Sequence, residues 1–275
     1  MISISYPTSN SPILNVMMRA VAIAARSIIR DFGEIEHLQV SKKNPINFVS
    51  ATNKKSERIL KEELEKARPG YGFSMEKSTT TIGIKKEYIW IIDPLDGSNN
   101  FLHGVPHFSI TVSLQKKKEI IAGVTYDPLK DEMFYAEKGF GAFMNQRRIR
   151  VSERKYLSES ILATGSPYQY KDASSLSALQ AVHSFYPCIR QTGSLSLDFA
   201  YVASGRLDGA WGYNLSYWDI SAGMLMIREA GGCISNIKNI DKNSITFKDK
   251  KSYFPSLSIT VTNFHLHKIL TNLTN

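Results

Sequence analysis

Cysteine is nearly absent from this chain. Among its 275 residues only Cys188 and Cys233 are cysteines, and neither belongs to a Cys-x-x-Cys pair. A disulfide framework is therefore excluded as the basis of the fold, and we interpret both residues as reduced core residues of a cytoplasmic protein. The chain also has no internal repeat and no low-complexity tract.

The chain lacks a long uninterrupted hydrophobic run. Residues 13–29 are apolar, but Asn15, Arg19 and Arg26 interrupt them, so they do not predict a membrane span. No basic residue precedes Arg19, and no small-residue cleavage site follows a suitable apolar run. We therefore expect no secretory signal and no membrane partner.

Acidic side chains are outnumbered by basic ones. The chain has 34 Lys and Arg residues against 25 Asp and Glu residues, a formal net charge of +9 at pH 7. Such a charge suits an anionic partner and permits weak nucleic-acid binding. The lysines are scattered without interleaved aromatic residues, so no motif supports nucleic acid or the transcription machinery as a partner. A solvated basic surface is the simpler interpretation.

Histidine provides no evident metal site. His265 and His267 lie two residues apart on a predicted terminal helix, where such positions do not face one another. His103 and His107 flank the strongest motif of the chain, and we assign none of the four as a metal ligand.

That motif is the stretch Trp90–Phe101, which reads WIIDPLDGSNNF. The hydrophobic run Tyr88–Ile92 predicts a buried strand, and it ends at two aspartates, Asp93 and Asp96. Hard divalent cations such as Mg²⁺ prefer carboxylate oxygens and leave room for a substrate phosphate. The two carboxylates are therefore candidate ligands for a metal ion.

The residues between and after the aspartates favour a sharp change of chain direction. Pro94 biases Asp93 toward an extended backbone, Gly97 permits a tight turn, and Ser98 is a suitable N-cap for a helical turn. From these residues alone an Asp-rich turn without a metal is an equally good interpretation.

Two long signatures resemble those of the inositol monophosphatase family. Residues 93–101, DPLDGSNNF, are similar to the first family signature, usually DP[IL]DGTTNF, and residues 218–232 match the second, WDxxAGxxxxxEAGG. The resemblance covers nearly the whole chain and is strongest to the bacterial branch of extragenic suppressor proteins. It implies an inositol-1-monophosphatase-like phosphoric monoester hydrolase.

The hydrophobic pattern predicts two differently organised halves. Residues 1–150 predict helices followed by a largely antiparallel sheet, whereas residues 151–275 alternate strands with helices, which is typical of α/β layers. The family resemblance implies a five-layer αβαβα sandwich of the metal-dependent sugar phosphatase type. Its N-terminal α+β lobe would carry Glu76, Asp93 and Asp96, and its C-terminal α/β lobe would carry Asp219.

The periodicity also predicts individual elements. In the first half we expect a helix from Ser11-Pro12 to Gly33, a short strand over 46–52, a helix over 54–66, a half-buried strand over 108–114, and a hairpin of 120–126 with 132–137. In the second half we expect strands over 160–164, 188–191, 208–211 and 257–262, and helices over 173–183, 194–203 and 218–230, with a last helix from about residue 263.

The resemblance implies a ligand set for two or three Mg²⁺ ions. It assigns the side chains of Glu76, Asp93, Asp96 and Asp219 and the backbone carbonyl of Leu95. Asp93 would bridge two ions, Asp96 and Asp219 would hold the ion near the leaving oxygen, and Glu76 would hold the ion that activates water.

The resemblance also implies substrate contacts. Gly97 and Ser98 would offer N–H groups to the phosphate, and the Ser98 hydroxyl would orient the attacking water. Gly193 and Ser194 match a substrate-contacting pair at another helix start, although Gly-Ser is also an ordinary helix N-terminus.

Four positions depart from the family pattern. Asn53 replaces an aspartate that assists water activation, and an amide cannot accept a proton from water at neutral pH. Lys77 replaces an acidic neighbour of Glu76, Gly212 takes the place of a glutamate that binds inositol hydroxyls, and Leu195 replaces a small residue beside the substrate. We therefore expect a slow phosphatase or one with a changed substrate.

Three functions remain open from the sequence. The leading one is an Mg²⁺-dependent phosphatase for inositol monophosphate or a related sugar or polyol phosphate. A second is a phosphatase for another ester, such as histidinol phosphate or a 3′-phosphonucleotide. A third is a regulatory protein that keeps the fold with weak or no phosphatase activity. The resemblance also implies a homodimer.

Overall fold

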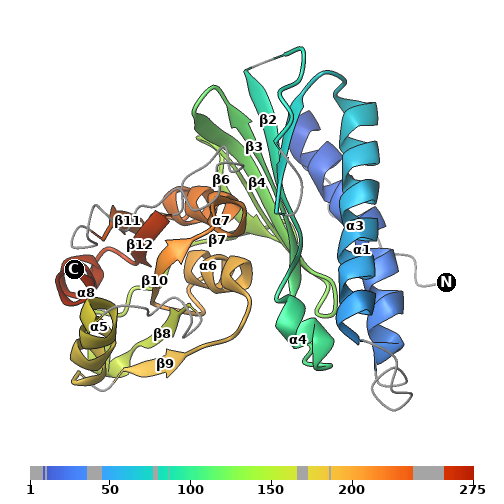
Figure 1. Ribbon diagram of the computed structural model, residues 1–275. Coiled ribbons are helices and arrows are strands. Elements are labelled where there is room, and N and C mark those ends of the chain that lie inside the picture. The colour runs from blue at the N-terminus through green and yellow to red at the C-terminus, as the bar shows by residue number, and fades with distance from the viewer. Residues whose placement is uncertain are drawn as a thin grey trace.

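Two sheets alternate with three layers of helices in this protein (Figure 1). The structure is a computed structural model and describes residues 9, 11–35, 45–76, 80–85, 87–165, 173–185, 187–237 and 257–275. The layer order is helices, sheet, helices, sheet, helices, so the expected five-layer sandwich is confirmed. Lys77 lies outside the described residues.

The first sheet has seven strands in sequence order, and only β1 and β2 run parallel to each other. The remaining neighbours pair antiparallel, as expected for a meander. The strands are β1 (Gly72–Met75), β2 (Tyr88–Asp96), β3 (Ser109–Lys116), β4 (Glu119–Asp127), β5 (Glu132–Glu137), β6 (Gly141–Met144) and β7 (Arg147–Ile149).

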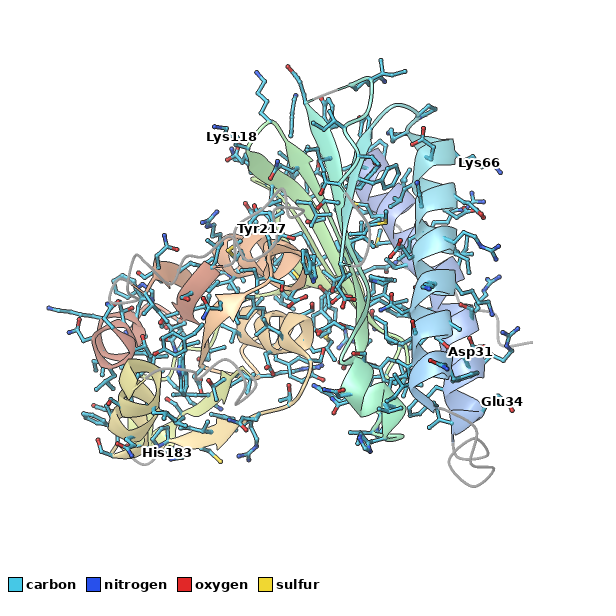
Figure 2. The ribbon with its side chains drawn as sticks, in the orientation of Figure 1. Asp31, Glu34, Lys66, Lys118, His183 and Tyr217 are labelled. Atoms are coloured by element: carbon cyan, nitrogen blue, oxygen red, sulfur yellow. The ribbon has the colours of Figure 1, made fainter. Side chains whose placement is uncertain are left out.

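Helices α1 (Pro12–Gly33) and α3 (Pro45–Ala67) cover the outer face of this sheet. The Ser11 hydroxyl accepts a hydrogen bond from the Leu14 N–H and Pro12 occupies the first turn, so α1 begins where the sequence predicts. Figure 2 labels Asp31 and Glu34 at one end of this layer and Lys66 at the other. The two helices are therefore antiparallel.

Among the described residues, α1 is the one helix whose length and apolar composition would allow it to cross a bilayer. In this structure 56% of its most apolar window is buried inside the protein. A core helix of this kind passes the same test as a membrane span, so the finding is weak evidence for a membrane.

The expected strand over 46–52 is wrong, because these residues form the first turns of α3. Their buried positions, Val49, Thr52, Asn53, Ser56 and Leu60, recur three or four residues apart, which is helical spacing. A short apolar run does not distinguish strand from helix when its length alone is considered.

Helices α6 (Leu195–Ala203) and α7 (Tyr217–Glu229) form the central layer and pack against both sheets. We expected the strand over 108–114 to be half-buried, and this expectation is wrong. All residues of β3 except Lys116 are buried, because helices cover both faces of the first sheet. The hairpin of β4 and β5 is confirmed.

The second sheet has five strands in the order β11, β12, β10, β8 and β9. Their bounds are β8 (Ile161–Thr164), β9 (Cys188–Arg190), β10 (Gly209–Leu215), β11 (Cys233–Asn236) and β12 (Leu257–Thr262). Strand β11 was not expected, because the sequence after Gly231-Gly232 shows no alternation. Helices α5 (Ala173–His183) and α8 (His267–Thr274) cover the outer face of this sheet.

The expectation of two core cysteines is wrong in part. Both thiols are free, but Cys188 is exposed on the edge strand β9 and Cys233 is only partly buried in the edge strand β11. Edge strands have a neighbour on one side only, so their side chains keep access to solvent.

Candidate active site

The two central aspartates lie at a bulge near the end of β2. Asp93 pairs with Thr111 and Asp96 pairs with Ser109, so the register shifts between them. The Leu95 N–H donates to Asp93 Oδ1 at 3.1 Å. A bulge of this kind changes the direction of side chains beside a functional site.

The turn that follows depends on a glycine. Gly97 has φ of +84°, and a Cβ there would lie 3.0 Å from the His107 carbonyl oxygen. Gly97 is the N-cap of α4 (Ser98–Leu102), without a side-chain cap, so the expectation that Ser98 caps this helix is wrong. Ser98 is instead the first helical residue.

Asp96 is held by the N-cap and first turn of α6. Ser194 donates its hydroxyl to Asp96 Oδ2 at 2.7 Å, and the Ser196 N–H donates to the same oxygen at 2.8 Å. Burial raises the pKa of Asp96, while hydrogen bonds from Ser194, Ser196 and the Leu195 N–H oppose that rise. Ser194 therefore contacts a predicted metal ligand directly.

Asp219 approaches from the first turn of α7, which follows β10 of the second sheet. Repulsion from Asp219 contributes to the raised pKa of Asp93, so the two carboxyl groups lie near one another. Ser196 connects this pair to Asp96, because its hydroxyl donates to the Asp219 carbonyl oxygen at 2.9 Å. The structure thus brings Asp93, Asp96 and Asp219 together.

The electrostatics of this cluster are unfavourable without a cation. Burial raises the pKa of Asp93 well above its ordinary value, and repulsion from Asp219, Asp96 and Glu76 adds to the rise. Burial and repulsion from Asp96 likewise raise the pKa of Asp219. Among the described residues no ion pair involves Asp93, Asp96 or Asp219.

Asn53 and Glu76 form the remaining part of the site. Asn53 is fully buried in α3, and its Nδ2 donates to Glu76 Oε2 at 3.3 Å. Asn53 Oδ1 is buried without a hydrogen-bond partner in the described part of the chain. A buried acceptor without a partner carries a desolvation cost, and a bound water would relieve it.

The oxygen atoms of these side chains are of the type that a hard divalent cation prefers as ligands. Among the described residues, three neighbouring carboxylates have no compensating positive charge, and a carboxamide oxygen beside Glu76 has no donor. As the described side chains are placed, however, no group of three or more Asp, Glu, His or Cys residues is arranged to hold a metal ion. The carboxylates are neighbours that would have to turn toward a common ion.

The predicted substrate residues are only partly brought together. Gly193 has φ of +86° and Ser194 contacts Asp96, so this loop lies beside the carboxylates. Gly212 is buried in β10, where a Cβ would lie 2.7 Å from Leu215 Cδ2. The close packing of this position against Leu215 explains a small residue there.

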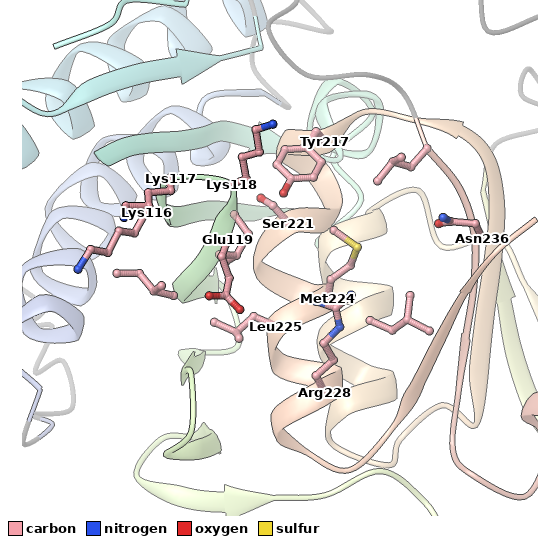
Figure 3. A pocket seen from close by; sticks show the side chains of 14 residues that line it. Lys116, Lys117, Lys118, Glu119, Tyr217, Ser221, Met224, Leu225, Arg228 and Asn236 are labelled. Atoms are coloured by element: carbon pink, nitrogen blue, oxygen red, sulfur yellow. The ribbon is translucent and has the colours of Figure 1, made fainter. Parts of the chain in front are cut away.

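A cavity of about 360 Å³ opens beside Ser98. It lies between the start of α3 and α4, and Ile46, Val49, Ser50, Asn99 and Leu102 line it together with Ser98. A larger cavity of about 750 Å³ lies elsewhere, between the β3–β4 turn and α7 (Figure 3). The larger cavity contains no predicted site residue.

Sequence reasoning missed four residues that organise the site. They are Asn100, Thr192, Ser196 and Asp198. Asn100 lies inside the first signature, and the other three flank the Gly193-Ser194 pair, so proximity to these motifs was the signal available. Burial raises the pKa of Asp198 well above its ordinary value, and its Oδ1 accepts a hydrogen bond from Thr192.

A five-layer sandwich with carboxylates gathered from its first sheet and its central helix layer is typical of a class of phosphoric monoester hydrolases. The chain belongs to the inositol monophosphatase family, whose model matches residues 9–274. The family is generally metal-dependent, and its members act on small phosphorylated substrates.

Relatives and solved structures agree with this assignment. A protein of Rhizobium meliloti named inositol-1-monophosphatase is 49% identical over 226 residues, covering 82% of this chain and 85% of that protein. A protein of Xylella fastidiosa named Nus factor SuhB is 36% identical, covering 88% of each chain. The native crystal structure of extragenic suppressor protein SuhB from Bartonella henselae has a TM-score of 0.83 and 43% identity, covering 96% of this chain and 99% of that one.

Proposed function

We propose that this protein is an Mg²⁺-dependent phosphomonoesterase that hydrolyses inositol monophosphate or a related sugar or polyol phosphate. The observation that carries the proposal is the carboxylate trio Asp93, Asp96 and Asp219, which comes from β2 and α7 and lacks a compensating cation among the described residues. Burying like charges without a counter-charge is costly, so a site of this kind serves a cationic ligand.

Each residue of the trio would have its own part in holding cations. Asp93 would help to hold two ions, Asp96 and Asp219 would hold the ion that serves the leaving oxygen, and Glu76 with the Leu95 carbonyl would complete the set of ligands. Two or three Mg²⁺ ions would neutralise the phosphate charge and acidify the attacking water. The protein's own contribution is to orient these carboxylates and exclude competing positive charge.

Gly97, Ser98, Gly193 and Ser194 would position the phosphate ester. The Gly97 turn places Ser98 at the wall of the 360 Å³ cavity, where its hydroxyl would orient the attacking water. Asn53 would hold that water through its unpartnered Oδ1 but would not accept its proton. We propose that Gly212 leaves the polyol with fewer polar contacts than a glutamate would give.

A phosphate-release assay tests this proposal. The assay uses a panel of monoesters containing inositol monophosphate, sugar phosphates, histidinol phosphate and a 3′-phosphonucleotide, each with Mg²⁺ or with chelator. Turnover of a sugar or polyol phosphate that needs Mg²⁺ supports the proposal. Turnover of only another ester changes the substrate class, and no turnover of any ester rejects the enzymatic function.

A second candidate function is regulation with weak or no turnover. Relatives named Nus factor SuhB share 36% identity with this chain, the net charge is +9, and Asn53 stands where the family has a proton acceptor. Binding to nucleic acid or to transcription machinery, with no phosphate release, would support this alternative.

We also propose a cytoplasmic homodimer in which residues 1–150 and 151–275 form two lobes. Family resemblance supports the dimer, and the division of the sheets near residue 150 supports the lobes. Light scattering at several protein concentrations would test the oligomeric state.

A further inference from the structure

Asn100 connects the two halves of the site through a pair of hydrogen bonds. Its Nδ2 donates to the His107 carbonyl oxygen at 2.7 Å and to the Thr192 carbonyl oxygen at 2.8 Å. His107 precedes β3 of the first sheet, whereas Thr192 precedes α6. Carbonyl oxygens only accept hydrogen bonds, so the amide group that faces both must be the nitrogen.

The backbone around Gly193 is shaped to receive this amide. Gly193 has φ of +86°, and a Cβ there would lie 2.8 Å from Asn100 Nδ2 and 2.9 Å from Oδ1. Any larger residue would therefore displace Asn100 or strain the loop. The contact is a close fit between the first-signature helix and the loop that carries Ser194.

Thr192 connects Asn100 to the carboxylate cluster through hydrogen bonds. Its hydroxyl donates to Asp198 Oδ1 at 2.8 Å, and its Oγ1 lies 3.3 Å from the Ser194 N–H that donates to it. Ser194 in turn donates its hydroxyl to Asp96. A continuous set of hydrogen bonds thus runs from the Asn100 amide through Thr192 and Ser194 to a predicted metal ligand.

We propose that Asn100 is a positioning residue, which fixes the Gly193-Ser194 loop against the Gly97-Ser98 turn so that both face one phosphate ester. Two complementary contacts hold these segments together. In the first contact, the Asp96 carboxylate accepts hydrogen bonds from the Ser194 hydroxyl and the Ser196 N–H. In the second, the Asn100 amide donates a hydrogen bond to the Thr192 carbonyl oxygen. The inference rests on the proposed phosphatase reaction.

The isosteric change Asn100→Asp is the sharpest test of this role. It keeps the shape of the side chain but sets a carboxylate oxygen against two carbonyl oxygens, so attraction becomes repulsion. A misplacement of about 1 Å in an active site can cost about 10²-fold in rate, so we expect kcat/KM to fall by roughly 10- to 100-fold. Asn100→Ala removes both hydrogen bonds without adding repulsion, so its kcat/KM should fall less than that of Asn100→Asp.

The matched control is Asn236→Asp, the same change on an exposed residue at the end of β11. It should leave kcat, KM and the Mg²⁺ response at wild-type values. Thr192→Val keeps the carbonyl but removes the hydroxyl, so its effect should not add to that of Asn100→Ala if both act on one loop. Additive effects of the two substitutions would contradict a role for Thr192 in connecting Asn100 to Ser194.

Calorimetric titration with Mg²⁺ and with inorganic phosphate separates positioning from simple support of the fold. We expect Asn100→Asp to weaken both ligands several-fold while the protein remains folded by circular dichroism. Wild-type ligand affinities in a folded Asn100→Asp variant, or a loss of activity that matches only the unfolded fraction, would overturn the inference. A wild type without phosphate release would instead reject the proposed function, and the titrations would still test Asn100.

Discussion

Asp96 and Asn53 are held in very different ways. The Asp96 carboxylate accepts hydrogen bonds from the hydroxyl of Ser194 and the backbone of Ser196, which come from a different layer of the fold. Asn53 makes a single 3.3 Å hydrogen bond to Glu76 and leaves its oxygen without a partner in the described structure. The Asp96 carboxylate is therefore fixed by several donors, whereas the Asn53 carboxamide is fixed by one hydrogen bond among the described residues.

This difference separates two kinds of change in an enzyme site. A carboxylate tied to several donors cannot be replaced without leaving those donors unsatisfied. A residue whose principal partner would be a water molecule can change more easily, because water adapts to the new group. The departure at position 53 thus lies at a buried side chain with fewer hydrogen bonds than Asp96 has among the described residues.

The largest effect is expected from Asp93→Asn. The change removes a buried negative charge that would hold two cations, so we expect turnover to fall by at least about 10³-fold. The same change should raise the melting temperature in chelator, because it removes repulsion with Asp219. Wild-type turnover by this variant would contradict the central assignment of the site.

A smaller effect is expected from Asp219→Asn. This residue would contact only the cation near the leaving oxygen, so we expect a loss of about 10²-fold that excess Mg²⁺ partly restores. Steady-state rates measured over a series of Mg²⁺ concentrations check this expectation. A loss that no Mg²⁺ concentration changes would mean that Asp219 serves the fold and not the ion.

Asn53→Asp should change turnover in the opposite direction. A carboxylate can accept the proton that the amide cannot, so we expect roughly a tenfold gain at saturating Mg²⁺ and neutral pH. In chelator the new carboxylate would face Glu76 in place of a hydrogen bond, so the melting temperature should fall.

The matched control for that change is Asn53→Ala, which removes the hydrogen bond to Glu76 without adding a base. It should lower the melting temperature without a gain in rate. If Asn53→Asp leaves turnover at or below the wild-type value, the site uses another mechanism. Lys77→Glu is a related change that we expect to tighten Mg²⁺ binding, although residue 77 lies outside the described residues.

The smallest effect concerns pH and stability without metal. The pKa values of Asp93 and Asp219 are raised on folding, so the folded protein retains protons that the unfolded chain releases. Stability from these groups is therefore present at low pH and is lost as pH rises through the raised pKa values. We expect the melting temperature in chelator to fall as the pH rises above the ordinary carboxyl pKa of 3.8.

Saturating Mg²⁺ should reduce that fall, because the ion stabilises the ionised carboxylates. Asp93→Asn serves as the control and should show a weaker pH dependence in chelator than the wild type. An identical pH dependence in the presence and absence of Mg²⁺ would contradict a cation site at these carboxylates.

Sequence predicted those parts of the site that are continuous along the chain. The buried strand, the two aspartates and the Gly97 turn follow from one stretch of residues, and the helix with Asp219 follows from another. The contacts between Ser196, Asp96 and Asp219 could not be predicted, because they depend on how the central helices lie between the sheets. Tertiary packing decides such contacts, and periodicity carries no information about it.

The errors of element type have a related cause. Residues 46–52 form helix because their buried positions contact the first sheet at helical spacing, which only the packed structure reveals. Strand β3 is buried on both faces because α7 covers the side that alternation predicts to be exposed. The edge positions of β9 and β11 likewise explain why Cys188 and Cys233 are more exposed than their residue type suggests.

The carboxylate cluster joins β2 of the first sheet to α7 of the central helix layer, and this has a consequence for folding kinetics. Asp93 and Asp219 are far apart in sequence, so we expect their approach to be a late step in the formation of the structure. Bringing them together requires electrostatic work in a chain without cations, and that work falls on the step in which α7 docks onto the first sheet. Mg²⁺ should therefore speed the last phase of refolding as well as slow unfolding, and stopped-flow refolding with and without the ion would show both.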